Sequence, residues 1–95
     1  MKTYTVYILR CSDKSYYTGV TSNLDKRIIE HQSGKHPDAY TFNRRPVELM
    51  YIGEFQYISQ AIAHEKQVKG WSRKKKEALI EDNWEEVVRL SNLKK

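Results

Sequence analysis

The chain has 95 residues, of which 39% are hydrophobic and 12% aromatic, so it can build one compact core but not two domains. No segment approaches the roughly 20 consecutive apolar residues of a membrane span, and the N-terminus lacks the apolar core of a signal peptide, so we expect a cytoplasmic monomer with no membrane partner. The net charge of +5 permits nucleic-acid binding without requiring it, and the single cysteine, Cys11, excludes an internal disulfide and a cysteine-rich metal site.

Three segments have the composition of β-strands. Thr3 to Leu9 and Tyr16 to Thr21 are rich in Tyr, Thr, Val and Ile, and the polar segment Cys11 to Ser15 between them predicts a hairpin loop. A third strand is predicted from Val47 to Phe55, with Pro46 at its start, where a missing N–H is tolerated. We expect the strands to pair in antiparallel fashion and in sequential order.

Serine caps and glycine stops predict four helices. Their expected ranges are Leu24 to Gln32, Gln60 to Lys69, Arg73 to Glu81 and Trp84 to Leu90. Ser22, Ser59 and Ser72 are the expected caps of the first three helices, and Gly34 and Gly70 end the first two.

The order of these elements predicts the fold class. Residues Lys35 to Arg45 lack helical periodicity and predict a long loop. The order ββαβαα, with an extra C-terminal helix, predicts an α/β (α+β) fold in which helices flank a small three-stranded antiparallel sheet. We expect the domain to span residues 1–83, followed at 84–95 by a short helix and the charged tail Lys94-Lys95.

In the predicted hairpin, Tyr7 and Tyr17 lie on the same face of the sheet. A five-residue loop pairs Arg10 with Tyr16, which places Tyr7 opposite Gly19 and Tyr17 diagonally beside it. The missing side chain of Gly19 is expected to leave room above the Tyr7 ring for a ligand. The alternative is that the tyrosines are only good strand residues and that Gly19 marks a bulge.

The first predicted helix carries a histidine on its apolar stripe. Leu24, Ile28 and His31 follow one another at i, i+4 and i+7, and Arg27 borders the same stripe. Alternatively, His31 is a core histidine with satisfied hydrogen bonds, and the alkyl chain of Arg27 packs along the core.

The second predicted helix carries a carboxylate in the same kind of position. Glu65 stands in the stripe formed by Ala61, Ile62 and Val68. A buried carboxylate must be paired, bound to a metal or shifted in pKa, because burying an unpaired charge is very costly. A structural ion pair with Arg27 or with a lysine is the alternative to a metal site.

The same residues carry a family pattern. In this order, the chain resembles the GIY-YIG endonuclease superfamily through Val6-Tyr7-Ile8, Tyr17-Thr18-Gly19, Arg27, His31 and Glu65. The resemblance covers roughly residues 3 to 82 and is to the small stand-alone bacterial subgroup, whose members are uncharacterised. It implies the same three-stranded fold and a metal-dependent endonuclease that hydrolyses phosphodiester bonds in DNA, including structured or damaged DNA in repair or recombination.

The resemblance also implies roles for individual residues. Glu65 is expected to bind a single divalent cation, Mg²⁺ or Mn²⁺, and Arg27 to neutralise charge on the scissile phosphate. One carboxylate is enough for Mg²⁺, which keeps several waters. A tyrosine, Tyr7 or Tyr17, is expected to activate or orient the attacking water. Because a phenol with a pKa of about 10 is protonated at neutral pH, His31 is a rival base, and the choice stays open.

A basic run follows Glu65 and predicts a surface for nucleic acid. The residues expected to contact it are Gly19, Arg44, Arg45, Lys66, Lys69, Arg73, Lys74, Lys75 and Lys76. Trp71 either stacks on a base or packs into the core beneath a solvated lysine-rich helix. Many active relatives have an asparagine about a dozen residues after the glutamate. Here Glu77 stands near that distance, so the supporting contact is absent or comes from Lys75 or Lys76.

Two other functions compete with the endonuclease. One is a nucleic-acid-binding domain that has lost most of its catalysis, and the other is a protein-interaction module, which the acidic segment Glu77 to Glu86 favours. If the protein is an enzyme, Glu65→Ala should abolish cleavage and leave binding intact. A nucleic-acid-binding domain without catalysis has no cleavage reaction to lose. The second is expected to show no salt-sensitive affinity for nucleic acid.

Overall fold

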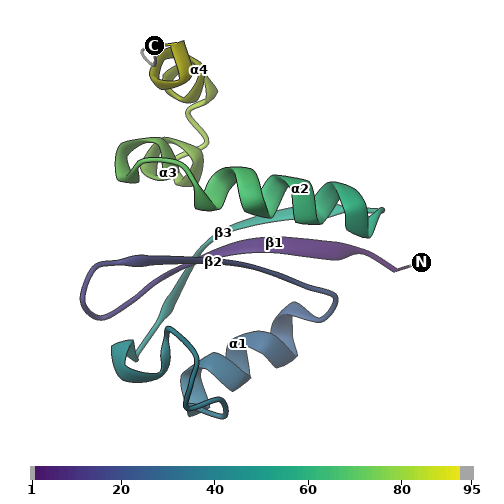
Figure 1. Ribbon diagram of the computed structural model, residues 1–95, viewed down its shortest axis with the longest axis vertical. Coiled ribbons are helices and arrows are strands. Elements are labelled where there is room, and N and C mark those ends of the chain that lie inside the picture. The colour runs from purple at the N-terminus through teal and green to yellow at the C-terminus, as the bar shows by residue number, and fades with distance from the viewer. Residues whose placement is uncertain (1, 93–95) are drawn as a thin grey trace.

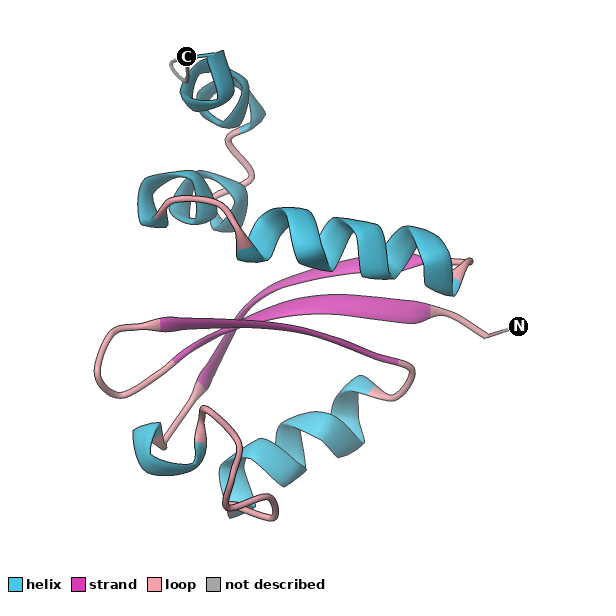
Figure 2. Ribbon diagram, in the orientation of Figure 1, coloured by secondary structure: helices cyan, strands magenta, loops and turns pink. Residues whose placement is uncertain are grey.

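A computed structural model describes residues 2–92, and the predicted tail Lys94-Lys95 lies outside this range. The strands are β1 (Tyr4–Arg10), β2 (Tyr16–Thr21) and β3 (Glu48–Phe55), and the helices are α1 (Leu24–Ser33), α2 (Ile58–Lys69), α3 (Arg73–Ile80) and α4 (Trp84–Asn92). The predicted α+β fold with a three-stranded antiparallel sheet is confirmed (Figure 2). Within residues 2–92, no helix is both long enough and apolar enough to cross a membrane.

The central strand of the sheet is β1. The predicted hairpin register is confirmed, with Arg10 opposite Tyr16 and Tyr7 opposite Gly19. The expected sequential order is wrong, because β3 pairs with β1 and the order is β2-β1-β3. The continuous apolar run Val6 to Leu9, buried at every position, is typical of a strand covered on both faces and was the signal for this arrangement.

Helices cover both faces of the sheet, with α1 on one side and α2 and α3 on the other (Figure 1). Side chains of β1 alternate between these faces, so the core has two halves. On the α2 side, Ile8 packs with Val68 and with Val87 of α4. On the α1 side, Tyr7 packs with Leu9. A strand that is central to the core therefore also supplies the first candidate site residue.

Two of the three expected serine caps are not used. Asn23, not Ser22, caps α1 through its side chain. Helix α2 begins at Ile58, before Ser59, and has no side-chain cap. The predicted cap Ser72 is confirmed at the start of α3. Since Asn and Ser cap equally well, the sequence pattern defines a helix start only to within a residue or two.

Candidate active site

The side chains of Tyr7, Tyr17 and His31 meet between the sheet and α1. The ring centroids of the two tyrosines are 6.2 Å apart, and that of His31 lies 5.9 Å from Tyr7 and 5.2 Å from Tyr17. Leu24 and Ile28 pack against the same core cluster. The helical stripe and the strand alternation thus bring these three side chains together.

Both ring nitrogens of His31 are hydrogen-bonded inside the protein. Nε2 lies 3.0 Å from the Tyr7 hydroxyl, and Nδ1 lies 2.8 Å from Oγ1 of Thr41, a side chain only 1% exposed. Thr41 comes from the segment before a short 3-10 helix, η1 (Phe42–Arg44), inside the predicted long loop. A neutral imidazole has one donor and one acceptor nitrogen, so these contacts satisfy it fully.

Burial sets the protonation states in this cluster. It raises the pKa of Tyr7 to about 12 and, together with the charge of Arg27, lowers the pKa of His31. The Tyr7 hydroxyl raises the pKa of Arg27. The Nε of Arg27 is buried and has no hydrogen-bond partner among residues 2–92. At neutral pH the cluster therefore holds a protonated phenol, a neutral imidazole and a guanidinium with a spare donor.

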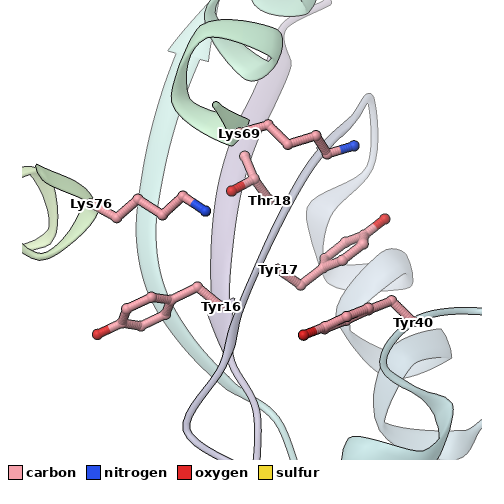
Figure 3. Close-up of a pocket in the computed structure, with 6 residues that line it drawn as sticks. All are labelled: Tyr16, Tyr17, Thr18, Tyr40, Lys69 and Lys76. Atoms are coloured by element: carbon pink, nitrogen blue, oxygen red, sulfur yellow. The ribbon is translucent and has the colours of Figure 1, made fainter. Parts of the chain in front are cut away.

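A pocket of about 300 Å³ lies beside β2, which is an edge strand (Figure 3). Its lining consists of Tyr16, Tyr17, Thr18, Tyr40, Lys69 and Lys76. Tyr17 belongs to the α1 side of the sheet, whereas Thr18 pairs with Ile8 and belongs to the α2 side. Groups from both faces therefore reach this pocket, while Tyr7 and His31 are buried.

Glu65 lies on the α2 face of the sheet, opposite to Tyr7 and His31, and is 9% exposed. Its carboxylate forms an ion pair with the Lys69 ammonium at 3.0 Å, so of the two expected ion pairs the lysine one is present. The Lys69 side chain is 59% exposed and the Glu65 side chain 12% exposed. The carboxylate thus has a partner in the structure, as the predicted alternative to a metal site requires.

The donor set at Glu65 suits a hard cation. Residues 2–92 contain no cluster of three or more His, Cys, Asp or Glu side chains that could hold a metal on its own. Magnesium is commonly held by one or two carboxylates plus substrate phosphate and water, and Glu65 supplies one carboxylate. The residues present therefore fit a Mg²⁺ or Mn²⁺ ion that is completed by substrate.

Glu77 is held by structural contacts on α3. It accepts a hydrogen bond from the Tyr16 hydroxyl at 3.3 Å and pairs with Nε of Arg73 at 3.1 Å. The Arg73 guanidinium also lies 4.5 Å from the centre of the Tyr16 ring. These contacts join α3 to β2. On the neighbouring helix α2, the predicted nucleic-acid contact Lys66 is exposed.

The lysines of α3 have different neighbours. The Lys75 ammonium lies 4.3 Å from the centre of the Trp71 ring, and Trp71 packs against the core, as the second of its two predicted roles requires. Arg89 and, more weakly, Lys74 lower the pKa of Glu86 on α4. Among the basic residues of α3, Lys76 is the one that lines the pocket beside β2.

The two arginines before β3 support the wall of the pocket. The Arg44 guanidinium lies 3.9 Å from the centre of the Tyr40 ring and donates to the Tyr40 carbonyl oxygen at 2.7 Å. Tyr40 in turn stacks on Tyr17, with centroids 6.1 Å apart. Arg45 donates to the carbonyl oxygen of Phe42 at 2.8 Å. Both arginines are therefore engaged in ordering the loop that carries Tyr40.

Comparison with known proteins identifies the family. Residues 3–78 match the family described as the GIY-YIG catalytic domain. The chain belongs to this family. It is 46% identical over 82 residues to a UPF0213 protein of Syntrophus aciditrophicus, covering 86% of this chain and 94% of that protein. A UPF0213 protein of Natronomonas pharaonis is 43% identical over 77 residues, which is 81% of this chain and 89% of that protein.

Two solved structures have the same fold. The solution NMR structure of the UPF0213 protein from Bacillus halodurans has a TM-score of 0.55 and 43% identity, with 83% of each chain covered. That of a protein from E. faecalis has a TM-score of 0.61 and 32% identity, with 86% of each chain covered. The GIY-YIG fold of this chain thus agrees with experimental structures of relatives.

Within the GIY-YIG motifs of this chain, the expectation of ligand space at Gly19 needs correction. A Cβ built on Gly19 would lie 2.5 Å from the Tyr7 hydroxyl oxygen and 2.6 Å from its Cζ. The ring of Tyr7 itself fills the space that the glycine leaves, because the two residues are directly opposed in the hairpin. Gly19 therefore admits the tyrosine of the first motif into the core.

Gly19→Ala is expected to lower the free energy of unfolding by about 1–3 kcal/mol, because the added methyl displaces a fully buried ring that is hydrogen-bonded to His31. Urea denaturation measures this change. Gly70→Ala is the matched control, since its Cβ would meet only the Gln67 and Lys66 carbonyl oxygens at 3.7 and 3.8 Å. Equal stability of the two variants would show that the Tyr7 ring is free to move.

The buried histidine predicts a pH dependence of stability. Because burial lowers the pKa of His31 below 6.5, the unfolded chain takes up a proton first as the pH falls. The contribution of His31 to the free energy of unfolding is complete above pH 6.5. It is lost as the pH falls from 6.5 to the lower pKa that His31 has in the folded protein. Unfolding at about pH 7.5 and about pH 5.5 should show a smaller difference for His31→Gln than for wild type. His36→Gln, at an exposed histidine, is the control and should keep the wild-type difference between the two pH values. If His31→Gln also keeps the wild-type difference, the assignment to His31 is wrong.

Proposed function

We propose that this protein is a metal-dependent endonuclease that hydrolyses phosphodiester bonds in DNA. The observation that carries the proposal is that buried polar groups lie on both faces of the edge strand β2. On the α1 face, the Nε of Arg27 is buried without a hydrogen-bond partner among residues 2–92, and on the α2 face Glu65 is a buried carboxylate. A phosphodiester bound across β2 meets an arginine from one side and a cation-binding carboxylate from the other.

Arg27 is suited to the charge of the scissile phosphate. Its guanidinium is permanently charged and presents a planar fork of donors that matches phosphate oxygens. The contact between its Nη1 and Glu30 is long, at 3.4 Å, and the Arg27 side chain is 38% exposed. The Tyr7 hydroxyl raises the pKa of Arg27, so the guanidinium stays charged.

Glu65 would hold the divalent cation. When bound, Mg²⁺ or Mn²⁺ supplies positive charge to the phosphate and lowers the pKa of a coordinated water. Lys69, the present partner of the carboxylate, has a side chain that is 59% exposed, so its ammonium can turn toward solvent. The carboxylate is therefore both shielded from bulk water and accessible to a competing cation.

Tyr17 is the group that we assign to the attacking water. Of the three candidates Tyr7, Tyr17 and His31, it is Tyr17 that lines the pocket, and the other two are buried and hydrogen-bonded to each other. With its pKa raised to about 12, Tyr7 is a poor base. Tyr17 orients the water, while Tyr7 and His31 hold Tyr17 and Arg27 in place.

A cleavage screen tests the proposal. Single-stranded, gapped, branched and duplex DNA, and RNA of the same sequence, are incubated with Mg²⁺ or Mn²⁺ and with a chelator as control. We expect cation-dependent cleavage of at least one DNA. If every substrate is bound but none is cut, the nucleic-acid-binding domain replaces the enzyme, and if none is bound, the protein-interaction module does.

A further inference from the structure

Strand β2 carries a buried hydroxyl at Thr18. Thr18 is 2% exposed, and its Oγ1 makes no hydrogen bond to any group within residues 2–92. Most buried hydroxyls are paired, because an unmade hydrogen bond is costly in the folded state. Thr18 also lines the pocket beside β2. The Thr18 hydroxyl is therefore available to donate a hydrogen bond to a ligand in this pocket.

Two lysines line the same pocket. Lys69 from the end of α2 and Lys76 from α3 both line it, and in Figure 3 the Lys76 ammonium points toward the side of the strand that carries the Thr18 hydroxyl. Burial, helped by the charges of Arg73 and Lys69, lowers the pKa of Lys76. Lys76 forms no ion pair with any residue in the described range 2–92, and the nearby carboxylate of Glu65 is paired with Lys69.

We infer that this pocket binds a backbone phosphate of the nucleic acid adjacent to the scissile one, through the Thr18 hydroxyl and the Lys76 ammonium group. The identity of the ligand as nucleic acid rests on the proposed function. Tyr17 and Thr18 are consecutive on an edge strand and face opposite sides of the sheet, so one strand of nucleic acid crossing β2 can place successive phosphates on its two sides. Such a contact fixes register and does not read sequence.

The first test compares Lys76 with a lysine outside the pocket. DNA binding is measured by fluorescence anisotropy with a labelled oligonucleotide, in chelator and over a range of salt concentrations. Lys76→Gln should bind severalfold more weakly, with a slope of log affinity against log salt that is shallower by about 0.7 to 0.9. Lys2→Gln carries the same change of charge at an exposed residue that does not line the pocket, and it should keep the wild-type slope.

The second test removes the hydroxyl. Thr18→Val should weaken DNA binding severalfold without changing the salt slope, because the hydroxyl is neutral. Its melting temperature should equal or exceed that of wild type, because the substitution removes an unpaired polar atom. A purely structural hydroxyl would give the opposite result, with lower stability and unchanged binding.

Several outcomes overturn the inference. Equal effects of Lys76→Gln and Lys2→Gln would show diffuse attraction without a pocket, and a wild-type protein that binds no DNA would remove the ligand. Inorganic phosphate should displace the oligonucleotide from wild type beyond the effect of chloride at equal ionic strength, because it competes for the pocket, and an equal displacement from Lys76→Gln would also overturn the inference. Binding that depends on Lys76 and Thr18 in a protein that never cleaves would sustain the inference while the proposed function fails.

Discussion

Glu65→Gln is expected to lower the rate of DNA cleavage about a thousandfold or more while DNA binding stays within a few-fold of wild type. A divalent cation contributes several kcal/mol of transition-state stabilisation, and each 1.36 kcal/mol or so is a factor of ten in rate. The substitution keeps the size of a side chain that is 9% exposed but removes the charge that attracts the cation. Single-turnover cleavage at saturating protein measures the rate separately from binding.

The stability of the same variant distinguishes catalysis from folding. Replacing a buried charge by a neutral amide relieves a desolvation cost, so Glu65→Gln should unfold at the same or a higher urea concentration than wild type. Glu54→Gln, an exposed glutamate on β3 at the far edge of the sheet, is the matched control and should change neither property. Cleavage at the wild-type rate by Glu65→Gln would show that this carboxylate serves only the ion pair with Lys69.

Tyr17→Phe is expected to reduce the cleavage rate about a hundredfold or more, with little change in stability. Removing a group that transfers or orients a proton in the transition state typically costs a factor of about 10² to 10⁴. Phenylalanine keeps the ring that stacks on Tyr40, so the wall of the pocket is preserved. Steady-state and single-turnover rates, measured with urea denaturation of the same preparations, test the expectation.

Tyr7→Phe provides the contrast. Its hydroxyl is the partner of the buried Nε2 of His31, and leaving that nitrogen unpaired should cost about 1–3 kcal/mol of stability. We therefore expect Tyr7→Phe to lose more stability than Tyr17→Phe and less activity. The reverse ranking of the two rates would place Tyr7, not Tyr17, at the attacking water.

Local patterns in the sequence predicted the parts of the site that depend on them. The alternation of side chains along β1 and β2, with the length of the loop between them, was sufficient to predict that Tyr7 lies opposite Gly19. The helical period correctly predicted that His31 and Glu65 are buried. Both predictions need only the backbone geometry of one element or one tight hairpin. The bulk of Tyr7 filling the gap at Gly19 was also implicit in that register, although the gap was expected to hold a ligand.

The remaining features depend on contacts between distant segments, which no local period contains. Thr41 completes the hydrogen bonds of His31 from a loop without periodicity. The unpaired hydroxyl of Thr18 is visible only when every neighbour is known. The basic run on α3 illustrates the same limit, since only the three-dimensional contacts show that Lys75 lies over the Trp71 ring and that Lys76 lines the pocket.

The placement of α1 and α2 on opposite faces of the sheet has a mechanical consequence. The arginine and the carboxylate of the candidate site are carried by separate layers, and a single sheet of three strands is the only spacer between those layers in the described chain. Their separation is then set by the twist of that sheet and by the bulk of its inward-facing residues. Buried side chains of β1 such as Val6 and Ile8, which have no role in the proposed reaction, therefore tune the distance between the two halves of the site.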